Sequence, residues 1–437
     1  MYTYRCPACP CRHHPAISPH KDSPMTSATT TLAPISRELA RRRLALLSFF
    51  FIPGISLASW VTRTPAVRDQ LEASTAQMGL ILFGLSIGSM AGILGSAPLV
   101  RRLGTKPVTL LGLLCIVGGV ALIGGGVLLS SGIGAFIGLA VFGAGQGLAE
   151  IAMNVEGAEI ERLSGRSFLP YLHGAFSLGT VVGASLGILF TAMDFPVALH
   201  LVIIAAICML PIIWGIRYVP SGFGRQRDTT ETGSIATVYP VRRPLWKDHR
   251  LLLIGAIVLA MALAEGAAND WLPLLMVDGH GYDPAWGSLV FTGFALAMTI
   301  GRFTGGAVIN RFGRVAVVRG SALAGAIGIA LVVFVDNPVL AGIAVFFWGL
   351  GASLGFPLTI SAAGDTGEPG EDPARRVSAV ATTGYIAFLV GPPLLGFLGE
   401  HFGLRSAMIV VLAVVAVAIF LAPAVRPRAD AEQESTH

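Results

Sequence analysis

Two carboxylates lie deep inside long apolar runs of this 437-residue sequence. Glu150 belongs to a stripe in which Gln146, Glu150 and Asn154 recur every four residues, and Glu265 shares a helix face with Asn269. An ionised side chain at the centre of a bilayer costs at least about 2.5–3.5 kcal/mol, so it normally faces protein or a wet cavity. A carboxyl held there can exchange protons near neutral pH and accept hydrogen bonds from a solute. Helix packing without any transport role is the alternative for each acid.

Three further ionisable side chains lie in or near apolar runs. His173 could relay a proton, because the ordinary pKa of histidine is close to physiological pH, although a hydrogen-bonded packing histidine is the alternative. Arg302 is interpreted as a structural charge, either paired or extended toward the membrane surface. Glu156 lies nearer the end of its run, and we expect it to be solvated or paired with Arg162 or Arg166.

Membrane-spanning helices are the elements that must position these side chains. The chain is 54% hydrophobic and only 13% charged, whereas a soluble domain carries about 25% charged residues. Its apolar runs are about 18–25 residues long, enough for a helix to cross roughly 30 Å of hydrocarbon. Barrel strands would be about half as long and would alternate. We therefore predict an all-α polytopic protein with twelve spans: 44–62, 79–99, 107–129, 133–156, 168–191, 197–217, 250–272, 286–308, 315–335, 338–362, 377–399 and 404–424.

Basic residues indicate the orientation, because lysine and arginine remain on the cytoplasmic side. With twelve spans and the N-terminus inside, the opposite side holds only Arg63, Arg68 and Arg405. We expect a multi-pass protein of the bacterial inner membrane with both termini cytoplasmic. The net charge of +5 follows from this topology, so it indicates no nucleic-acid partner.

The two halves of the sequence repeat each other at an offset of 209 residues. The glycines that match are Gly84, Gly92 and Gly104 with Gly293, Gly301 and Gly313. A duplicated helical unit predicts a substrate site between the halves. By the same pseudosymmetry, Arg63 and Asp270 end equivalent helices, and we predict that they form an outer gate pair.

Polar stretches divide the chain into a tail (1–40), a six-helix bundle (41–218), a flexible cytoplasmic linker (219–249), a second six-helix bundle (250–425) and a tail (426–437). Met25 is an alternative start. The first tail holds Cys6, Cys9 and Cys11 among histidines, but their spacing matches no closed zinc site. We expect neither a metal nor a cofactor.

The basic motif after the second span of each half resembles the signature loop of the major facilitator superfamily. The residues that carry this resemblance are Arg102, Gly104 and Lys106 in the first half, and Asn310, Arg311, Gly313 and Arg314 in the second. Twelve spans, the repeat and the long central loop resemble that family too, so the match covers nearly the whole chain after about residue 40. More narrowly, segments 58–65, 154–157 and 265–271 look like those of a YbjJ-type inner-membrane protein.

The resemblance implies two pseudosymmetric six-helix bundles whose first, fourth, seventh and tenth spans line a central cavity. Glu150 and Glu265 would then approach the cavity from opposite halves, and Trp348 would reach it from the tenth span. The sequence departs from the family where an acidic residue usually follows the second span. Arg101 stands there and cannot bind a helix N-terminus as that acid does. The fourth span has Gly143 near the place of an expected arginine, which argues against a multidrug exporter.

We therefore expect a proton-coupled secondary transporter that works by alternating access on a small polar organic solute. Uptake by symport is preferred, because exporter signatures are absent. A proton-driven exporter of a metabolite or drug is the alternative, and a non-transporting membrane sensor is the alternative from another class. We expect a monomer and no enzymatic activity, because no catalytic arrangement has credible spacing. Proton coupling is assigned to Glu150, Glu265 and His173, and substrate contact to Gln146, Glu150, Asn154, Glu265, Asn269 and Trp348.

Overall fold

The computed structural model describes residues 37–164, 168–225, 245–366 and 373–426, and within them it contains helices and no strands. The first half consists of α1 (Arg37–Val61), α2 (Thr64–Leu71), α3 (Thr75–Leu103), α4 (Thr105–Leu128), α5 (Gly132–Ser164), α6 (Leu169–Ala192), α7 (Val197–Gly215) and the short η1 (Ile216–Tyr218). The second half consists of η2 (Leu245–Lys247), α8 (His249–His280), α9 (Pro284–Phe312), α10 (Arg314–Phe334), α11 (Pro338–Asp365), α12 (Pro373–Phe402), α13 (Leu404–Leu421) and η3 (Ala422–Val425).

Twelve of these helices are long and apolar enough to cross a membrane, which confirms the predicted number of spans. Most extend beyond the predicted apolar runs, because polar residues continue the helix past the hydrocarbon-length segment. The first begins at Arg37, inside the predicted tail. Helix α2 was not predicted, since its eight residues are too few and too polar to read as a span. The N-terminal cysteines and histidines and most of the linker lie outside the described residues.

Local sequence signals explain where several helices begin and end. Asp248 caps the first turn of α8 by accepting a hydrogen bond from the Leu251 amide at 3.0 Å, and Ser74 forms a capping box with Gln77 at α3. Gly104 and Gly313 separate α3 from α4 and α9 from α10, with positive φ angles of 90° and 77°. A residue without a Cβ adopts this conformation at little cost. The two glycines of the predicted repeat therefore have the same backbone role.

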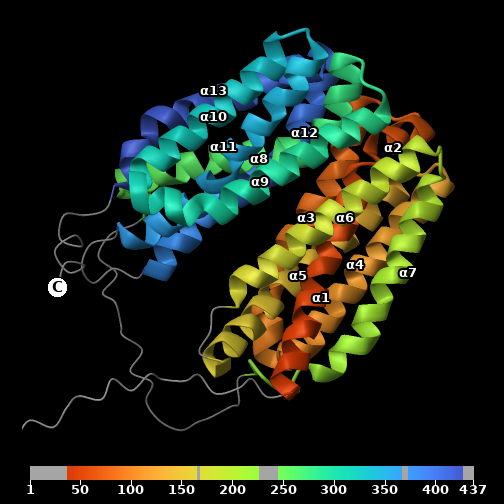
Figure 1. Cartoon of the computed structure of the whole chain (residues 1–437), viewed down its shortest axis with the longest axis vertical. Helices are drawn as coiled ribbons and strands as arrows, with labels where there is room; N and C mark the ends of the chain where they lie inside the picture. Colours follow the sequence, from red (N-terminus) through yellow and green to blue (C-terminus); the bar gives the residue numbers. More distant parts are fainter. Residues whose placement is uncertain (1–36, 165–167, 226–244, 367–372, 427–437) are drawn as a thin grey trace, which may run out of the picture. The chain divides into compact units, whose positions relative to one another are not determined.

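Helix packing is equivalent in the two halves. In the first half, α5 packs against α3 and α4, α1 against α6, and α4 against α7; in the second, α11 packs against α9 and α10, α8 against α12, and α10 against α13. Figure 1 shows α1 and α3 to α7 grouped together and α8 to α13 grouped together. The sequence repeat is thus a repeat of packing.

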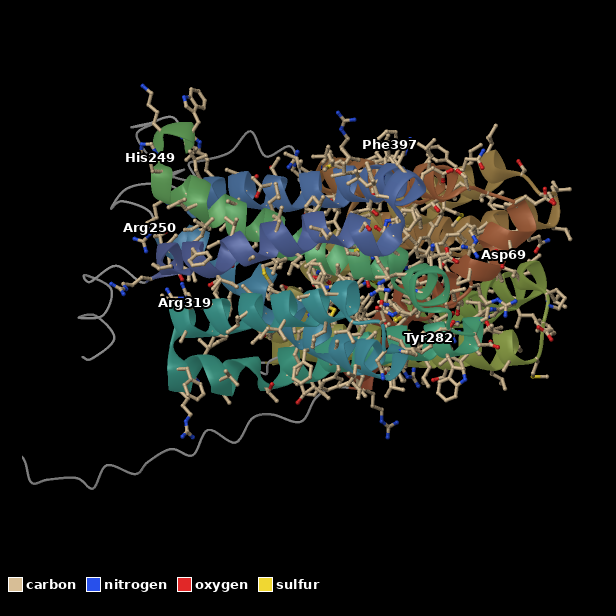
Figure 2. The ribbon with its side chains drawn as sticks, turned by 90° about the horizontal axis from the view of Figure 1, so that it is seen from above. Asp69, His249, Arg250, Tyr282, Arg319 and Phe397 are labelled. Atoms are coloured by element: carbon tan, nitrogen blue, oxygen red, sulfur yellow. The ribbon has the colours of Figure 1, made fainter. Side chains whose placement is uncertain are left out.

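The helix ends gather at two ends of the molecule. We call the end at which α8 begins the basic end, and the other the opposite end. Figure 2 shows His249, Arg250 and Arg319 at the basic end, and Asp69 and Tyr282 toward the opposite end. Arg250 donates to the carbonyl of Ala424 at 2.8 Å, so the start of α8 meets the end of the last described helix. Both ends of the described chain, at residues 37 and 426, belong to the basic end.

Hydrogen bonds between the halves lie away from the basic end. The Ala76 amide donates to Glu400 at 3.1 Å, and the Ser288 hydroxyl donates to the carbonyl of Thr62 at 2.9 Å. Deeper between the halves, the Ser86 hydroxyl of α3 donates to the carbonyl of Phe388 on α12 at 2.8 Å. At the basic end, the described ion pairs all join residues of one half. The halves are therefore bonded to each other at the opposite end and not bonded at the basic end within the described chain.

Candidate functional site

Helix α5 is held so that its polar stripe faces away from the two helices it packs on. A Cβ at Gly143 would lie 2.2 Å from the Leu85 carbonyl of α3, and one at Gly145 would lie 2.5 Å from the Gly112 carbonyl of α4. This close backbone contact fixes the rotation of α5. Glu150 is consequently an exposed side chain on the stripe predicted from its spacing.

The amides of the stripe are available for ligands. Gln146 and Asn154 are half-buried on α5, and Asn269 is half-buried on α8. Within the described part of the chain, none of the three side-chain amides forms a hydrogen bond. An amide carries two donors and an acceptor with two lone pairs, so these groups can bind hydroxyl, amine or carbonyl groups of a solute.

Glu265 of α8 forms an ion pair with Arg302 of α9, with Oε1 and Nη2 separated by 3.0 Å. The glutamate side chain is 16% exposed and the arginine side chain 43%. Helix α9 presents Arg302 on this side because its neighbour Gly301 packs against α11, where a Cβ would lie 2.1 Å from the Ser353 hydroxyl oxygen. Sequence analysis interpreted Arg302 only as structural, since its partner lies 37 residues away on another helix.

Arg302 also acts on side chains of the first half. Its charge interacts with Glu150 of α5 and with His173 of α6. Beside this pair, a Cβ at Gly174 would lie 3.5 Å from Cζ of Phe303, so α6 and α9 meet at the same level. The guanidinium that pairs with Glu265 of the second half therefore also acts electrostatically on Glu150 of the first.

Tyr385 of α12 completes this polar group, because its phenol interacts electrostatically with Glu150. We call Glu150, His173, Glu265, Arg302 and Tyr385 the inter-half polar cluster. The sequence offered no signal for Tyr385, since a lone aromatic residue in an apolar run resembles a packing residue.

His173 is exposed on α6, and its ring lies edge-on to Phe50 of α1 with centroids 5.5 Å apart. The hydroxyl of Ser177, one turn later, donates back to the His173 carbonyl at 3.1 Å. The imidazole therefore contacts an aromatic ring on one side and keeps access to the cluster. Its predicted role as a proton relay remains a proposal.

Trp348 does not occupy the position predicted for it. The side chain is fully buried, its Nε1 donates to the Ala264 carbonyl of α8 at 3.1 Å, and its ring packs edge-on to Phe294. A satisfied, inaccessible indole cannot contact a solute in this conformation. Trp348 instead supports the backbone of α8 beside Glu265. The repeat placed Trp348 on the tenth span correctly, but it could not show which way the ring points.

Arg63 and Asp270, the predicted gate pair, do not contact each other. Arg63 is buried in its own half, where it donates to the Thr191 hydroxyl at 3.1 Å and to the Phe195 carbonyl. Asp270 is 8% exposed and has no ionic partner among the described residues. The repeat predicted that both residues end equivalent helices. Arg63 follows the end of α1, but α8 continues beyond Asp270 to His280, and the two side chains do not meet.

Arg68 and Asp278 form the ion pair that joins the halves at the opposite end. Arg68 belongs to α2, which turns the chain toward the end of α8. Burial by itself would lower the pKa of Arg68, but hydrogen bonds to Asp278 and Asp69 raise it above the ordinary value. The guanidinium is therefore held charged at this contact. Sequence analysis missed the pair because it did not predict α2.

The signature loops lie at the basic end. Arg102 and Arg311 are exposed, as is Asn310, while Lys106 is half-buried. Arg314 begins α10 and pairs with Asp365 of α11 at 2.7 Å. These residues make no described ionic contact with the other half.

Glu156 differs from its expected environment. The carboxylate is fully buried and pairs with Arg42 of α1 at 2.5 Å, and it accepts a hydrogen bond from the Thr105 hydroxyl at 2.9 Å. Glu159, three residues later, is the partner of Arg162. The partner of Glu156 lies 114 residues earlier in the chain, a distance that local spacing cannot bridge.

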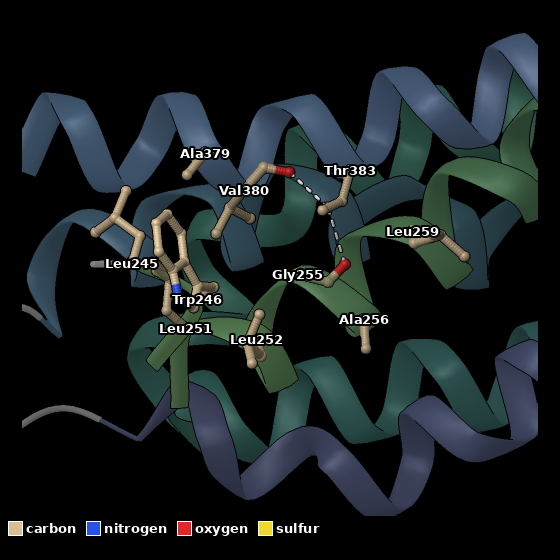
Figure 3. Close-up of a pocket in the computed structure, with 10 residues that line it drawn as sticks. All are labelled: Leu245, Trp246, Leu251, Leu252, Gly255, Ala256, Leu259, Ala379, Val380 and Thr383. Atoms are coloured by element: carbon tan, nitrogen blue, oxygen red, sulfur yellow. Dashed lines mark hydrogen bonds between the residues drawn. The ribbon is translucent and has the colours of Figure 1, made fainter. Parts of the chain in front are cut away.

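An apolar pocket of about 240 Å³ lies between α8 and α12, near the basic end (Figure 3). The one hydroxyl lining it, that of Thr383, donates to the Gly255 carbonyl at 3.0 Å. Apart from the indole N–H of Trp246, the lining side chains offer no free polar group. The residues of the polar cluster are not among those that line the pocket: Leu245, Trp246, Leu251, Leu252, Gly255, Ala256, Leu259, Ala379, Val380 and Thr383.

Known proteins resemble this chain in sequence and in fold. The profile of the Major Facilitator Superfamily matches residues 11–160, 171–371 and 287–436. An uncharacterized MFS-type transporter of Yersinia pestis is 29% identical over 365 residues, covering 82% of this chain and 89% of that protein. A mutant of the nucleoside transporter NupG has a TM-score of 0.69 at 15% identity, covering 88% of this chain and 99% of that one. The E. coli fucose:proton symporter FucP, also as a mutant, has a TM-score of 0.58 at 18% identity, covering 90% and 100%.

Proposed function

The chain belongs to the major facilitator superfamily and is a secondary transporter, and we propose that it moves a small polar organic solute together with protons. The observation that carries the proposal is the inter-half polar cluster, in which Arg302 pairs with Glu265 of the second half and interacts electrostatically with Glu150 of the first. Ionisable side chains inside membrane-spanning helices are costly and usually mark a transport path.

The contacts between the halves support alternating access. Three of these contacts lie toward the opposite end and one lies deeper, between α3 and α12, whereas no described bond joins the halves at the basic end. We propose that the basic end is cytoplasmic, by the distribution of lysine and arginine, and that the site opens toward it in this conformation. The membrane is then the bacterial inner membrane, and the path lies within one chain, so a monomer suffices.

The solute is a hydroxyl-bearing or amine-bearing molecule. Two carboxylates and the amides of Gln146, Asn154 and Asn269 supply mostly acceptors, and Arg302 offsets the charge of one carboxylate. A sugar-like or cationic solute is therefore preferred to an anion. Uptake by symport is preferred to export.

A two-stage experiment tests this function. Purified protein is first screened by thermal shift against hexoses, deoxy sugars, nucleosides, amino sugars and small amines, because binding to the folded state raises the Tm. Each solute that binds is then added to proteoliposomes holding a pH-sensitive dye. Solute-dependent proton entry is expected in the wild type, and it should be lost in Glu150→Gln and Glu265→Gln.

Two results would count against the proposal. Solute movement without proton movement in the wild type would remove the coupling and leave a uniporter. Full gradient-driven flux in both glutamine variants would show that these two acids do not couple transport to protons.

A further inference from the structure

We infer that Arg302 is a counter-ion shared in turn by Glu265 and Glu150, pairing with the glutamate of its own half in this conformation and with that of the other half when the basic end closes. This inference rests on the proposed function and identifies the residue that links proton binding to the movement of the halves. Neither the family match nor the sequence spacing assigns this role to Arg302.

The geometry allows the exchange. Arg302 is bound to Glu265 by a single contact of 3.0 Å, and 43% of its side chain is still exposed. An arginine has five N–H donors, so donors remain free for a second carboxylate. A permanent structural pair would be expected to be buried, as that of Arg42 and Glu156 is in the first half, where two guanidinium nitrogens approach one oxygen of a fully buried carboxylate.

Glu150 is placed to receive the guanidinium. It is exposed, has no ion pair among the described residues, and interacts with the charge of Arg302. The contact between Gly174 and Phe303 puts α6 and α9 side by side at this level, and α5 packs on α6. A rotation that closes the basic end would therefore carry α5 toward α9.

Other groups around the guanidinium are few. Helix α6 presents His173, and α12 presents Tyr385 to Glu150. Helix α11 presents the uncharged Ser353 beside Gly301, and the α10 arginines are at the basic end, where Arg314 is already paired with Asp365. Among the described residues, Glu265 and Glu150 are therefore the two acids that compete for Arg302.

Proton movement follows from this competition. When the basic end is closed, Arg302 holds Glu150 as a carboxylate, and Glu265 takes up a proton from the opposite side together with the solute. When the basic end opens, Arg302 returns to Glu265 and displaces that proton to the basic side while Glu150 stays ionised, so each cycle moves one proton inward. A guanidinium near a carboxylate favours its ionised form, so position and protonation change together.

Cross-linking tests, without any solute, whether position 302 approaches position 150 when the basic end closes. In a chain whose five native cysteines are replaced by serine, a short bifunctional maleimide should join Glu265→Cys with Arg302→Cys in every state. It should join Glu150→Cys with Arg302→Cys only in molecules closed at the basic end. Adding Asp278→Asn, which breaks the ion pair between the halves at the opposite end, should raise the second product severalfold and leave the first unchanged. Absence of the second product in both backgrounds would overturn the inference.

Transport measurements separate a coupling role from a structural one. Arg302→Gln should lower proton-driven accumulation at least about tenfold, within the usual range for coupling between sites, while solute exchange at equal concentrations persists. Arg302→Lys should restore part of the accumulation, and Arg319→Gln, which removes an exposed charge on α10, should change neither.

Recovery of accumulation in the double variant Arg302→Gln/Glu265→Gln would show that the pair is only structural. A wild type that moves solute without protons would instead refute the proposed function, and the cross-linking result would still stand.

Discussion

Substitution of Glu156 should strongly destabilise the protein, because its carboxylate is fully buried against Arg42 and Thr105. Glu156→Gln leaves the Arg42 guanidinium buried without a counter-ion, which costs about 3–5 kcal/mol. We expect a large fall in the Tm of the purified protein, measured by differential scanning fluorimetry. Glu159→Gln removes a half-buried acid one turn away whose partner, Arg162, is exposed to solvent, so it should change the Tm much less. Equal effects would show that Glu156 is not held as described.

Sequence spacing correctly predicted the residues that can be identified from a single helix, without knowledge of their partners. The four-residue interval picked out Gln146, Glu150 and Asn154, because a helix face is a local property. It failed for Arg302, whose role depends on Glu265 and Glu150 on two other helices. The burial of individual side chains could not be predicted for the same reason. A sequence shows that Trp348 is aromatic, but only the packing of α11 on α8 shows that its ring is enclosed.

Asp248 joins two stabilising contacts at the start of α8. It caps the first turn through the Leu251 amide and pairs with the buried Arg376 of α12 at 2.6 Å. Burial raises the pKa of Asp248, but the hydrogen bonds from Leu251 and Arg376 outweigh it, so the pKa is lower than usual. A carboxylate of this kind stabilises the folded state above its unfolded pKa of about 3.9, and the contribution is lost as the pH falls through the folded value.

The two substitutions at Asp248 separate these contacts. Asp248→Asn keeps a capping oxygen and loses the charge, so it should cost about 1 kcal/mol at pH 6–8, allowing for solvent screening. Asp248→Ala should cost about 1 kcal/mol more, because it also removes the cap. Thermal unfolding from pH 3 to pH 8 checks this. The difference between wild type and Asp248→Asn should shrink only below about pH 4, and a constant difference down to pH 3 would contradict the charge effect.

Helices α3 and α12 approach each other through glycines at the opposite end. A Cβ on Gly79 would lie 2.8 Å from the Pro392 carbonyl and 3.0 Å from Cα of Gly396. Gly79→Leu should force these helices apart and favour molecules open at the opposite end. Gly95→Leu on the same helix is the control, because an added Cβ there meets nothing within 4 Å.

Labelling of a cysteine at Gln146 with a membrane-impermeant maleimide measures this change. In the Gly79→Leu background, labelling from the side of the opposite end should rise severalfold, while the Gly95→Leu background should match the wild type. Unchanged labelling in both would mean that the α3–α12 contact does not hold the halves together.

Helix lengths and number were predictable, because hydrocarbon thickness fixes how long an apolar run must be. Helix α2 was not, since Thr64–Leu71 owes its place to packing against α4 and α8 rather than to apolar periodicity. The contacts between the halves could not be predicted from the sequence either. The sequence repeat predicts that α3 and α9 are equivalent, but not that Gly79 meets Gly396.

At the scale of the whole molecule, contacts between the halves decide which end is closed, and these contacts change when the halves rock. Arg68 and Asp278 join the halves at the opposite end, whereas Arg63 is bonded within its own half. The Arg68 pair is partly exposed, with side chains 19% and 32% accessible, so it contributes at most about 1 kcal/mol. One kcal/mol shifts a two-state equilibrium about fivefold, which labelling can detect.

Charge reversal distinguishes this pair from the one that pseudosymmetry predicted. Arg68→Asp or Asp278→Arg alone should raise labelling of a cysteine at Gln146 from the side of the opposite end about fivefold. The double variant should restore the wild-type level, because the attraction returns with opposite signs. Arg63→Asp combined with Asp270→Arg should give no such rescue, since the two buried side chains have separate surroundings and reversal leaves each without its partners. If that second double variant recovered and the first did not, the gate would be Arg63 and Asp270, and the contact between Arg68 and Asp278 would be incidental to closure.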